Sequence, residues 1–292
     1  MRIIFFLLLL FQFCHAYYKG ISFYGLETES RNFVCSWVSH FDYYLQHLHS
    51  LGFNFLRLPF SYQWVQEGDF TKMDEIIGSA WYWNMSVVLD MHRIQSSHQS
   101  WSPEDGITLN DFIQKGWLPM LDRYSNWPNV IMHNIYNEFQ GGSEHTAYLV
   151  DYSIKVMDAI EARYPNRFWH AITGFSWSGN ISGVEIEHLP YSDLIKYSLH
   201  KYAFSGTADE DDWNWSFGNL SPDHIIIGEF GFLKKDEDWA KRFIAYLRKR
   251  HIQSAAFWTI AHSHDTDGLW KDDCITFDWD KYNVLNRLWD PL

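Results

Sequence analysis

Short apolar runs alternate with longer segments of helical periodicity along most of the chain. The apolar runs are rich in β-branched and aromatic residues, which is typical of buried strands. We expect strands at residues 18–25, 53–60, 86–92, 130–138, 168–174, 194–202, 224–231 and 254–260. We expect helices between them, at residues 38–51, 71–83, 108–125, 144–163 and 234–250. Eight such units predict an α/β fold, a (β/α)8 TIM barrel.

The first sixteen residues, "MRIIFFLLLLFQFCHA", have one early positive charge, an unbroken apolar run and a small residue at position 16. The run is too short to span a bilayer, so the segment predicts a secretory signal peptide. An uncleaved signal anchor is the alternative. Residues 17–292 contain no Pro/Ser/Thr-rich linker and no repeat, and we expect one catalytic domain there, secreted to the extracellular space.

The chain without residues 1–16 is acidic. Removing Arg2 leaves 22 Lys and Arg against 36 Asp and Glu, so the formal net charge changes from −13 to −14. Such a balance disfavours nucleic acid and anionic membrane surfaces as partners. We therefore expect a mature protein that binds neither, and separately we expect a monomer.

Two cysteines, Cys35 and Cys274, remain when Cys14 leaves with the signal peptide. In an oxidising compartment an even pair predicts a disulfide, and strands one and eight become neighbours when the barrel closes. Two separate free thiols are the alternative. Four N-glycosylation sequons also fit a secreted protein, and they lie at Asn84, Asn180, Asn214 and Asn219. The sequon at Asn219 is weakened by Pro222, which directly follows its serine.

Polar residues gather at the predicted carboxyl ends of the strands, where a TIM barrel builds its active site. They are Arg57, Asp90, His92, Asn137, Glu138, His200, Tyr202, Glu229 and Trp258. Two carboxylates with imidazole and aromatic partners suit glycoside hydrolysis, and Glu138 and Glu229 are the candidate pair. A structural ion pair with Arg57 is the alternative for each glutamate, but one arginine can hardly neutralise both.

The other rim residues also allow two interpretations. Asn137 either caps the next helix or binds a sugar 2-hydroxyl. His200 and Tyr202 are two apart on one strand and share a face, as substrate-binding or as half-buried core residues. Trp258 is either barrel filler or a flat floor under a pyranose ring.

These residues resemble glycoside hydrolase family 5, the cellulase-type retaining β-glycanases, over essentially the whole mature chain. The matching motifs are "LRLP" (Arg57), "LDMH" (His92), "YNEF" (Asn137 and Glu138), "HKY" (His200 and Tyr202), "GEFG" (Glu229) and "FWT" (Trp258). The resemblance implies that Glu138 is the acid/base and Glu229 the nucleophile, with Tyr202 and Arg57 supporting the nucleophile. One departure is Phe139, where the family usually has proline.

The resemblance implies a secreted retaining endo-β-1,4-glucanase, with a β-linked polysaccharide or oligosaccharide as substrate and no cofactor. The alternatives are the same chemistry on β-mannan, β-1,3-glucan or glucosylceramide, and a catalytically silent carbohydrate-binding barrel. Retention requires carboxyl groups about 5–5.5 Å apart. The two roles predict a raised pKa for Glu138 and an ionised Glu229.

Two further stretches are candidates for the cleft walls. "HRIQSSHQSW" offers His98 and Trp101, and "AHSHDTDGLW" offers residues that could touch sugar: His262, Asp265, Asp267 and Trp270. The second stretch also has metal-like spacing at His262, His264, Asp265 and Asp267, but it makes no complete ligand set, and we expect no metal. "DEDDWNWS" (209–216) is either a cleft wall or a solvated loop.

Overall fold

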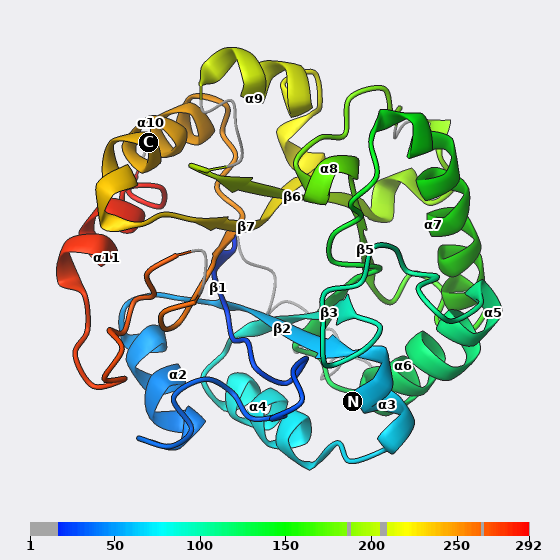
Figure 1. The fold of residues 1–292 in the computed structure, drawn as a ribbon, viewed down its shortest axis with the longest axis horizontal. Helices are drawn as coiled ribbons and strands as arrows, with labels where there is room; N and C mark the ends of the chain where they lie inside the picture. The colour runs from blue at the N-terminus through cyan, green and yellow to red at the C-terminus, as the bar shows by residue number, and fades with distance from the viewer. Residues whose placement is uncertain (1–16, 186–187, 205–208, 264–265, 292) are drawn as a thin grey trace, which may run out of the picture.

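The computed structural model describes residues 17–185, 188–204, 209–263 and 266–291, so the expected signal peptide lies outside the described residues. Eight parallel strands form one closed barrel (Figure 1). They are β1 (Lys19–Ser22), β2 (Phe55–Ser61), β3 (Ser86–Arg93), β4 (Val130–Asn134), β5 (Trp169–Thr173), β6 (Ile195–Tyr202), β7 (Ile225–Gly231) and β8 (Ala255–Phe257). The predicted TIM barrel is confirmed, and the largest shift of a strand end is at β4, which stops at Asn134.

Helices surround the barrel (Figure 1). The predicted segments contain α2 (Phe41–Ser50), α4 (Thr71–Tyr82), α5 (Leu109–Asp111), the π-helix η1 (Phe112–Trp117), α6 (Leu118–Tyr124), η2 (Ser143–His145), α7 (Thr146–Glu161), η6 (Lys234–Asp236) and α10 (Glu237–Lys249). Short elements that the sequence pattern did not predict are α3 (Tyr62–Glu67), α8 (Phe175–Ser178), η4 (Ser192–Leu194), α9 (Glu210–Phe217), η5 (Pro222–His224) and α11 (Trp279–Asn286). Within the described ranges, no helix is both long and apolar enough to cross a membrane.

Helix α9 corrects the prediction for residues 209–216, which form neither a cleft wall nor a solvated loop. The Asp209 carboxylate accepts a hydrogen bond from the backbone N–H of Asp212 and so caps the helix at its start. Trp213 is buried and packs on Phe243 of α10, with ring centroids 5.0 Å apart. The acidic run is therefore the first turn of an amphipathic helix, where negative charge is favoured by the helix dipole.

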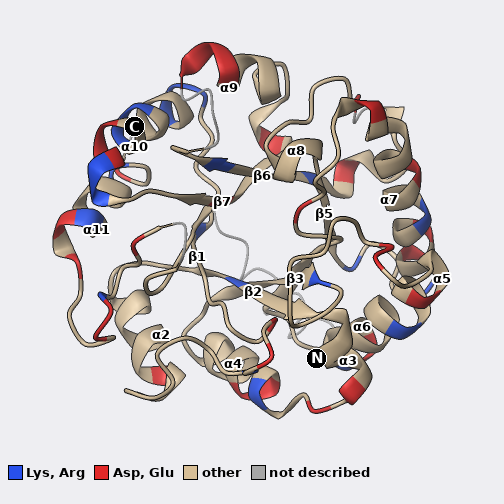
Figure 2. Cartoon of the chain, viewed as in Figure 1, with Lys and Arg blue, Asp and Glu red and all other residues tan. Residues whose placement is uncertain are grey.

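Charge is carried mainly on the outer helices, and α10 illustrates the pattern (Figure 2). Its first turn contains Glu237 and Asp238, and its last turn contains Arg248 and Lys249, as the helix dipole favours. Its buried face packs on the barrel with Trp239, Ala240, Phe243, Ile244 and Leu247. This separation of charged and apolar faces explains why the helix was predictable from sequence.

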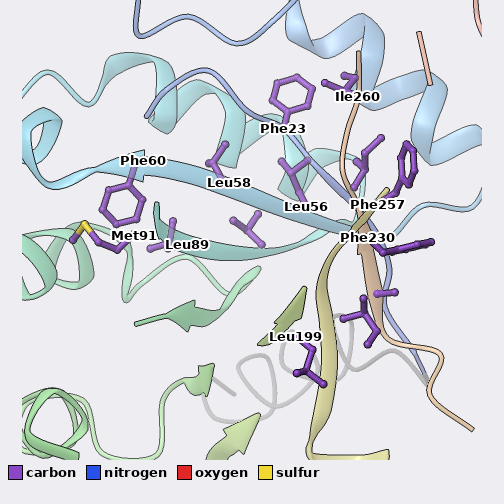
Figure 3. Close-up of a cluster of buried hydrophobic side chains, with 14 of the residues drawn as sticks. Phe23, Leu56, Leu58, Phe60, Leu89, Met91, Leu199, Phe230, Phe257 and Ile260 are labelled. Atoms are coloured by element: carbon purple, nitrogen blue, oxygen red, sulfur yellow. The ribbon is translucent and has the colours of Figure 1, made fainter. Parts of the chain in front are cut away.

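Alternate residues on each strand face opposite sides of the barrel wall. Outward-facing residues pack under the helices in a large apolar cluster that includes Leu56, Leu58, Leu89 and Met91 (Figure 3). The barrel interior holds a smaller cluster of Phe55, Val88, Met132, Ala171, Ile226 and Ala256. On strand after strand, the next inward position toward the carboxyl end is polar or aromatic, and these positions form the site described below.

A bulge in β7 places Glu229 inside the barrel. Leu199 of β6 pairs with Ile227 and the next residue, His200, pairs with Glu229, so Gly228 is an extra residue in β7. A bulge lets two consecutive residues face the same side, which simple alternation forbids. Gly228 permits it, because a Cβ there would lie 2.1 Å from Ser198 Oγ.

The predicted disulfide between Cys35 and Cys274 is confirmed, with a Cα–Cα distance of 5.5 Å. It joins the loop after β1 to the segment after β8, and these two strands are hydrogen-bonded neighbours in the closed barrel. The bond closes a loop of 239 residues. In the chain-entropy model, a disulfide that closes such a long loop lowers the entropy of the unfolded chain. It thereby stabilises the folded state by up to about 5 kcal/mol.

Candidate active site

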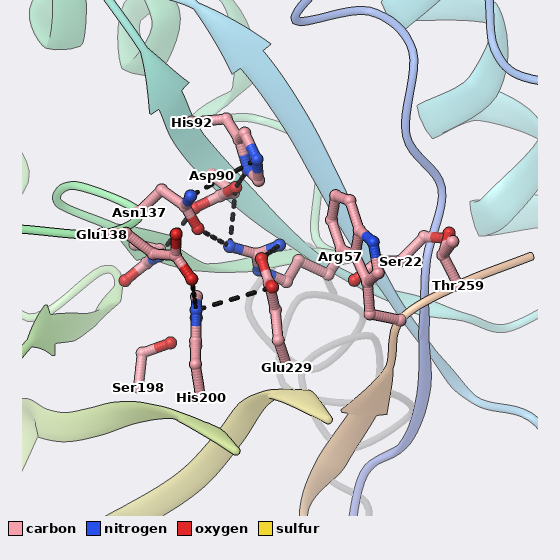
Figure 4. A network of polar contacts seen from close by, with 12 residues as sticks. Ser22, Arg57, Asp90, His92, Asn137, Glu138, Ser198, His200, Glu229 and Thr259 are labelled. Atoms are coloured by element: carbon pink, nitrogen blue, oxygen red, sulfur yellow. Dashed lines mark hydrogen bonds and ion pairs between the residues drawn. The ribbon is translucent and has the colours of Figure 1, made fainter. Parts of the chain in front are cut away.

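Arg57 is the centre of a buried polar network at the carboxyl end of the barrel (Figure 4). One of its terminal nitrogens, Nη1, donates to Glu229 Oε1 at 2.6 Å. The other, Nη2, donates to Asn137 Oδ1 at 2.5 Å and lies 2.8 Å from Asp90 Oδ2. Burial opposes the charge on Arg57, but Asp90 and Glu229 outweigh burial and raise its pKa. The guanidinium is therefore a fixed positive charge beside Glu229.

Asp90 and His92 hold the Asn137 side chain from the opposite side. Asp90 Oδ2 lies 2.7 Å from His92 Nδ1, and His92 Nε2 lies 3.3 Å from Asn137 Nδ2. Burial lowers the pKa of His92 to about 4, so the ring is neutral near pH 7. A neutral ring that donates from Nδ1 to Asp90 accepts at Nε2 from the amide. Asn137 thus has both its side-chain oxygen and its side-chain nitrogen engaged, and it does not serve as a helix cap.

Glu229 has a hydrogen-bond donor at each carboxylate oxygen. Arg57 binds Oε1, and the Tyr202 hydroxyl donates to Oε2 at 2.5 Å. Burial nevertheless raises the pKa of Glu229, with His200 and Arg57 opposing the rise. We expected opposite pKa shifts for the two glutamates, with Glu229 ionised, but the pKa of Glu229 is shifted upward because desolvation outweighs the two nearby donors. Therefore the hydrogen-bond contacts of the two glutamates, and not their pKa values, distinguish an acid/base from a nucleophile.

Glu138 lies across the site from Glu229 and is the more exposed of the two. Its side chain is 16% exposed, compared with 5% for Glu229. Its Oε1 atom lies 2.8 Å from His200 Nδ1, which is itself 3.6 Å from Glu229 Oε2. Ligating atoms of Glu138, His200 and Glu229 all lie within 4.8 Å of one another. The two carboxylates therefore face a common point with one histidine between them.

These groups open into a cavity of about 620 Å³. Trp258 lies on one side and stacks on His92 with ring centroids 5.3 Å apart and planes 13° apart. Trp177 and Phe204, which are 52% and 60% exposed, also line the cavity. Aromatic faces suit the apolar faces of sugar rings, so the cavity offers a site for more than one pyranose.

Sequence reasoning missed six residues that line the cavity: Arg93, Gln99, Ser176, Trp177, Gly179 and Phe204. Phe204 could have been found, because it continues the two-residue spacing of His200 and Tyr202. Trp177 carries no comparable signal, since a left-handed backbone turn at Ser176, Trp177 and Ser178 presents it to the cavity.

Trp270, His98 and Trp101 are among the predicted binding residues that do not line the cavity. Trp270 is 1% exposed and packs on Tyr44 and Phe277, so it is a core residue and the prediction for it is wrong. A large aromatic side chain after β8 gains more from full burial than from the rim. His98 has a side chain that is 56% exposed, and it faces Asp105 at 3.6 Å and does not line the cavity.

The other candidates after β8 are only partly placed. His262 lies 3.6 Å from Asp267 and 3.8 Å from Asp272, whereas His264 and Asp265 lie outside the described residues. The metal-like spacing of this stretch therefore remains a sequence pattern. Glu138, His200 and Glu229 offer a possible set of metal ligands, but the two glutamates are also the candidates for the acid/base and the nucleophile.

The four sequons differ in exposure. Asn214 and Asn219 are exposed, Asn84 is half-buried and Asn180 is buried. A glycan needs a free path from the amide nitrogen, so the fold favours Asn214 and Asn219 and disfavours Asn180. Glycosylation at all four stays a prediction.

Similarity to known proteins agrees with the geometry. The chain is 26% identical to an endoglucanase of Paenibacillus polymyxa over 95% of this chain and 84% of that protein. It is 23% identical to the major extracellular endoglucanase of Xanthomonas campestris, over 93% of this chain and 67% of that protein. An endocellulase from Pyrococcus horikoshii, in a crystal structure with cellotetraose, superposes with a TM-score of 0.82 at 25% identity and covers 94% of this chain and 93% of its own.

The family model for cellulase, glycosyl hydrolase family 5, matches residues 14–263. That range contains all eight strands and both candidate carboxylates. The chain therefore belongs to glycosyl hydrolase family 5 and is a glycoside hydrolase.

Proposed function

We infer that this protein is a secreted endo-β-1,4-glucanase that hydrolyses β-glucan with net retention of anomeric configuration. The observation that carries the inference is the carboxylate pair, whose facing atoms lie within 4.8 Å. Retaining enzymes place their carboxyl groups about 5–5.5 Å apart, whereas inverting enzymes leave about 6.5–9.5 Å for a water molecule. The short separation supports attack by a carboxylate on the sugar itself.

Contacts favour Glu229 as the nucleophile. Arg57 and Tyr202 hold both of its oxygens in place, and the Arg57 charge favours the ionised form that attacks the anomeric carbon. Glu138 has more solvent access and protonates the departing oxygen. Glu138 then takes a proton from the water that releases the sugar from Glu229. Arg57 and His92 fix the Asn137 side chain, and we expect its amide to hydrogen-bond a sugar hydroxyl at the same point.

The β-1,4-glucan assignment is supported by the similar proteins. The endocellulase of Pyrococcus horikoshii was crystallised with cellotetraose, and both bacterial relatives named above are endoglucanases. Secretion is supported by the apolar segment at residues 1–16 and by one relative that is described as extracellular. N-terminal sequencing of protein from the culture medium should begin at Tyr17.

Proton NMR of the first product tests the stereochemistry. Cleavage of cellopentaose should release the β anomer at first, with the α anomer appearing only by slow mutarotation. Early release of the α anomer would overturn the retaining mechanism. Release of reducing ends from β-1,4-glucan but not from β-mannan, β-1,3-glucan or glucosylceramide tests the substrate.

A further inference from the structure

Phe204 lies at the rim of the cavity, just beyond the carboxyl end of β6. His200 and Tyr202 share the inner face of β6, and Phe204 follows two residues later, in the turn after the strand ends at Tyr202. His200 contacts Glu138, and Tyr202 donates to Glu229. Phe204 stacks on Tyr202 with ring centroids 5.1 Å apart and planes 20° apart. The Phe204 ring therefore lies next to the two carboxylates, one layer closer to solvent.

Folding alone does not explain why the Phe204 side chain is exposed to solvent. The residue is 60% exposed although it is large and apolar, and it lines the cavity together with Trp177. One face of the ring packs on Tyr202, so the exposed part of the ring faces the cavity. An exposed aromatic ring inside a binding cavity indicates a contact surface for a ligand.

The position of Trp177 indicates which end of a bound sugar chain would contact Trp177 and Phe204. The backbone N–H of Trp177 donates to the carbonyl of Phe139 at 2.9 Å, and the N–H of Ser176 donates to the carbonyl of Gly141 at 2.8 Å. Trp177 is thereby tied to the loop that follows Glu138, the acid that must stand beside the departing oxygen. Phe204 follows β6, which is the barrel neighbour of β5, the strand that precedes Trp177, whereas Trp258 follows β8, on the far side of β7.

We propose that Phe204 is a specificity-determining residue that binds the leaving-group sugar, through stacking of its ring on the apolar face of the pyranose on the reducing-end side of the cleaved bond. The inference rests on the proposed glucanase function and adds the residue that selects the leaving group. The same surface accepts a sugar that attacks the glycosyl–enzyme in place of water. In that step the acceptor hydroxyl forms a bond to the anomeric carbon, the bond to Glu229 breaks with its electron pair, and Glu138 takes the proton.

The test compares Phe204→Ala, Phe204→Leu and Phe204→Tyr with the wild type on two substrates. Cellotetraose has a sugar leaving group, and 2,4-dinitrophenyl β-cellobioside has an activated one whose turnover is limited by hydrolysis of the glycosyl–enzyme. Loss of one stacking contact should lower kcat/KM on cellotetraose about five- to tenfold in Phe204→Ala. Phe204→Tyr should keep the wild-type value, because it keeps the planar ring, and Phe204→Leu should fall between them.

Two readouts separate this role from simple support of Tyr202. The kcat on the dinitrophenyl substrate should stay within twofold of wild type in all three variants. With cellobiose added as acceptor, the ratio of transfer to hydrolysis should fall in Phe204→Ala by about the factor seen in kcat/KM. Trp215→Ala is the matched control, since Trp215 is 63% exposed on α9 and does not line the cavity.

Unchanged kinetics in Phe204→Ala would overturn the inference. Equal losses of kcat on both substrates, with an unchanged transfer ratio, would also overturn it, because Phe204 would then act only through Tyr202 and Glu229. A wild-type enzyme that releases dinitrophenol but cleaves no cello-oligosaccharide would instead refute the proposed substrate, and this inference with it.

Discussion

Within the described part of the chain, one buried cluster of histidines and carboxylates opens to the cavity, and another is enclosed. The cluster that we propose to be catalytic joins Glu138 and His200 to Glu229 inside the barrel. The second cluster lies outside the barrel wall, where Glu161 of α7 is 2.9 Å from His170 of β5, and His170 is 3.0 Å from His133 of β4.

The two clusters have similar residues but different surroundings. Trp117 and Phe168 pack against His133, and the ring of Tyr191 lies 6.1 Å from that of His170, so the second cluster is enclosed by aromatic rings. Neighbouring residues on β4 illustrate the difference: Asn134 faces inward and donates to Asp90, whereas His133 faces the helices. The side of the strand, and not the residue type, therefore decides whether a polar group joins the network inside the barrel or lies beneath the helices.

Removal of the nucleophile should have the largest effect. Glu229→Ala leaves no carboxylate to form the glycosyl–enzyme, so turnover should fall by at least about 10⁴-fold on natural and activated substrates alike. Added azide should at best give the α-glycosyl azide by direct displacement. Product NMR checks this, and a β-glycosyl azide from this variant would exchange the roles of the two glutamates.

Removal of the acid/base should have a smaller and substrate-dependent effect. Glu138→Ala should lose about 10²- to 10⁴-fold on cello-oligosaccharides, which need a proton on the leaving oxygen. The first step on 2,4-dinitrophenyl β-cellobioside should persist, visible as a burst of dinitrophenol, because that leaving group needs no proton. Azide should then restore turnover and yield the β-glycosyl azide.

Acid should destabilise the protein through its buried histidines. Burial lowers the pKa of His92 and of His200 to about 4, and it also lowers the pKa values of His133 and His170. An unfolded histidine has a pKa near 6.5, so the unfolded chain binds protons that the folded chain does not, and stability falls as pH drops from about 6.5 toward 4. His92 and His200 each contribute at most roughly 3 kcal/mol.

Glu229 acts in the opposite direction. Its raised pKa means that the folded state takes up its proton first, so that contribution is present at low pH and is lost as pH rises through the folded-state value. Urea unfolding at pH 7 and pH 4.5 measures the balance. Equal free energies of unfolding at the two pH values would contradict the histidine argument, and His200→Gln should flatten the dependence if His200 contributes.

Most of the barrel was predictable because its strands are apolar runs that end in polar residues. On β2, the inward-facing residue Phe55 is followed by Arg57, and on β3, Val88 is followed by Asp90 and His92. Alternation along a strand thus places polar side chains next to the apolar cluster inside the barrel. Local pattern could not predict the bulge at Gly228, which depends on pairing with β6. It also misplaced Trp270, since only the packing of α2 against the segment after β8 shows that this ring is enclosed.

The smallest effect is expected in the enclosed cluster, and it should appear in stability alone. Glu161→Gln keeps the shape of the side chain but removes the charge that accepts from His170 Nε2 and from the backbone N–H of Asn166. Hydrogen bonds to charged groups contribute about 1.5–3 kcal/mol, so urea unfolding at pH 7 should show a loss in that range or slightly below. The kcat and KM on cellotetraose should not change, because this cluster lies outside the barrel wall. Glu138→Gln is the matched variant and should show the reverse, with a large loss of kcat and little loss of stability. A tenfold loss of kcat in Glu161→Gln would mean that the two clusters are coupled through β4 and β5, and the division between catalytic and structural histidines would then fail.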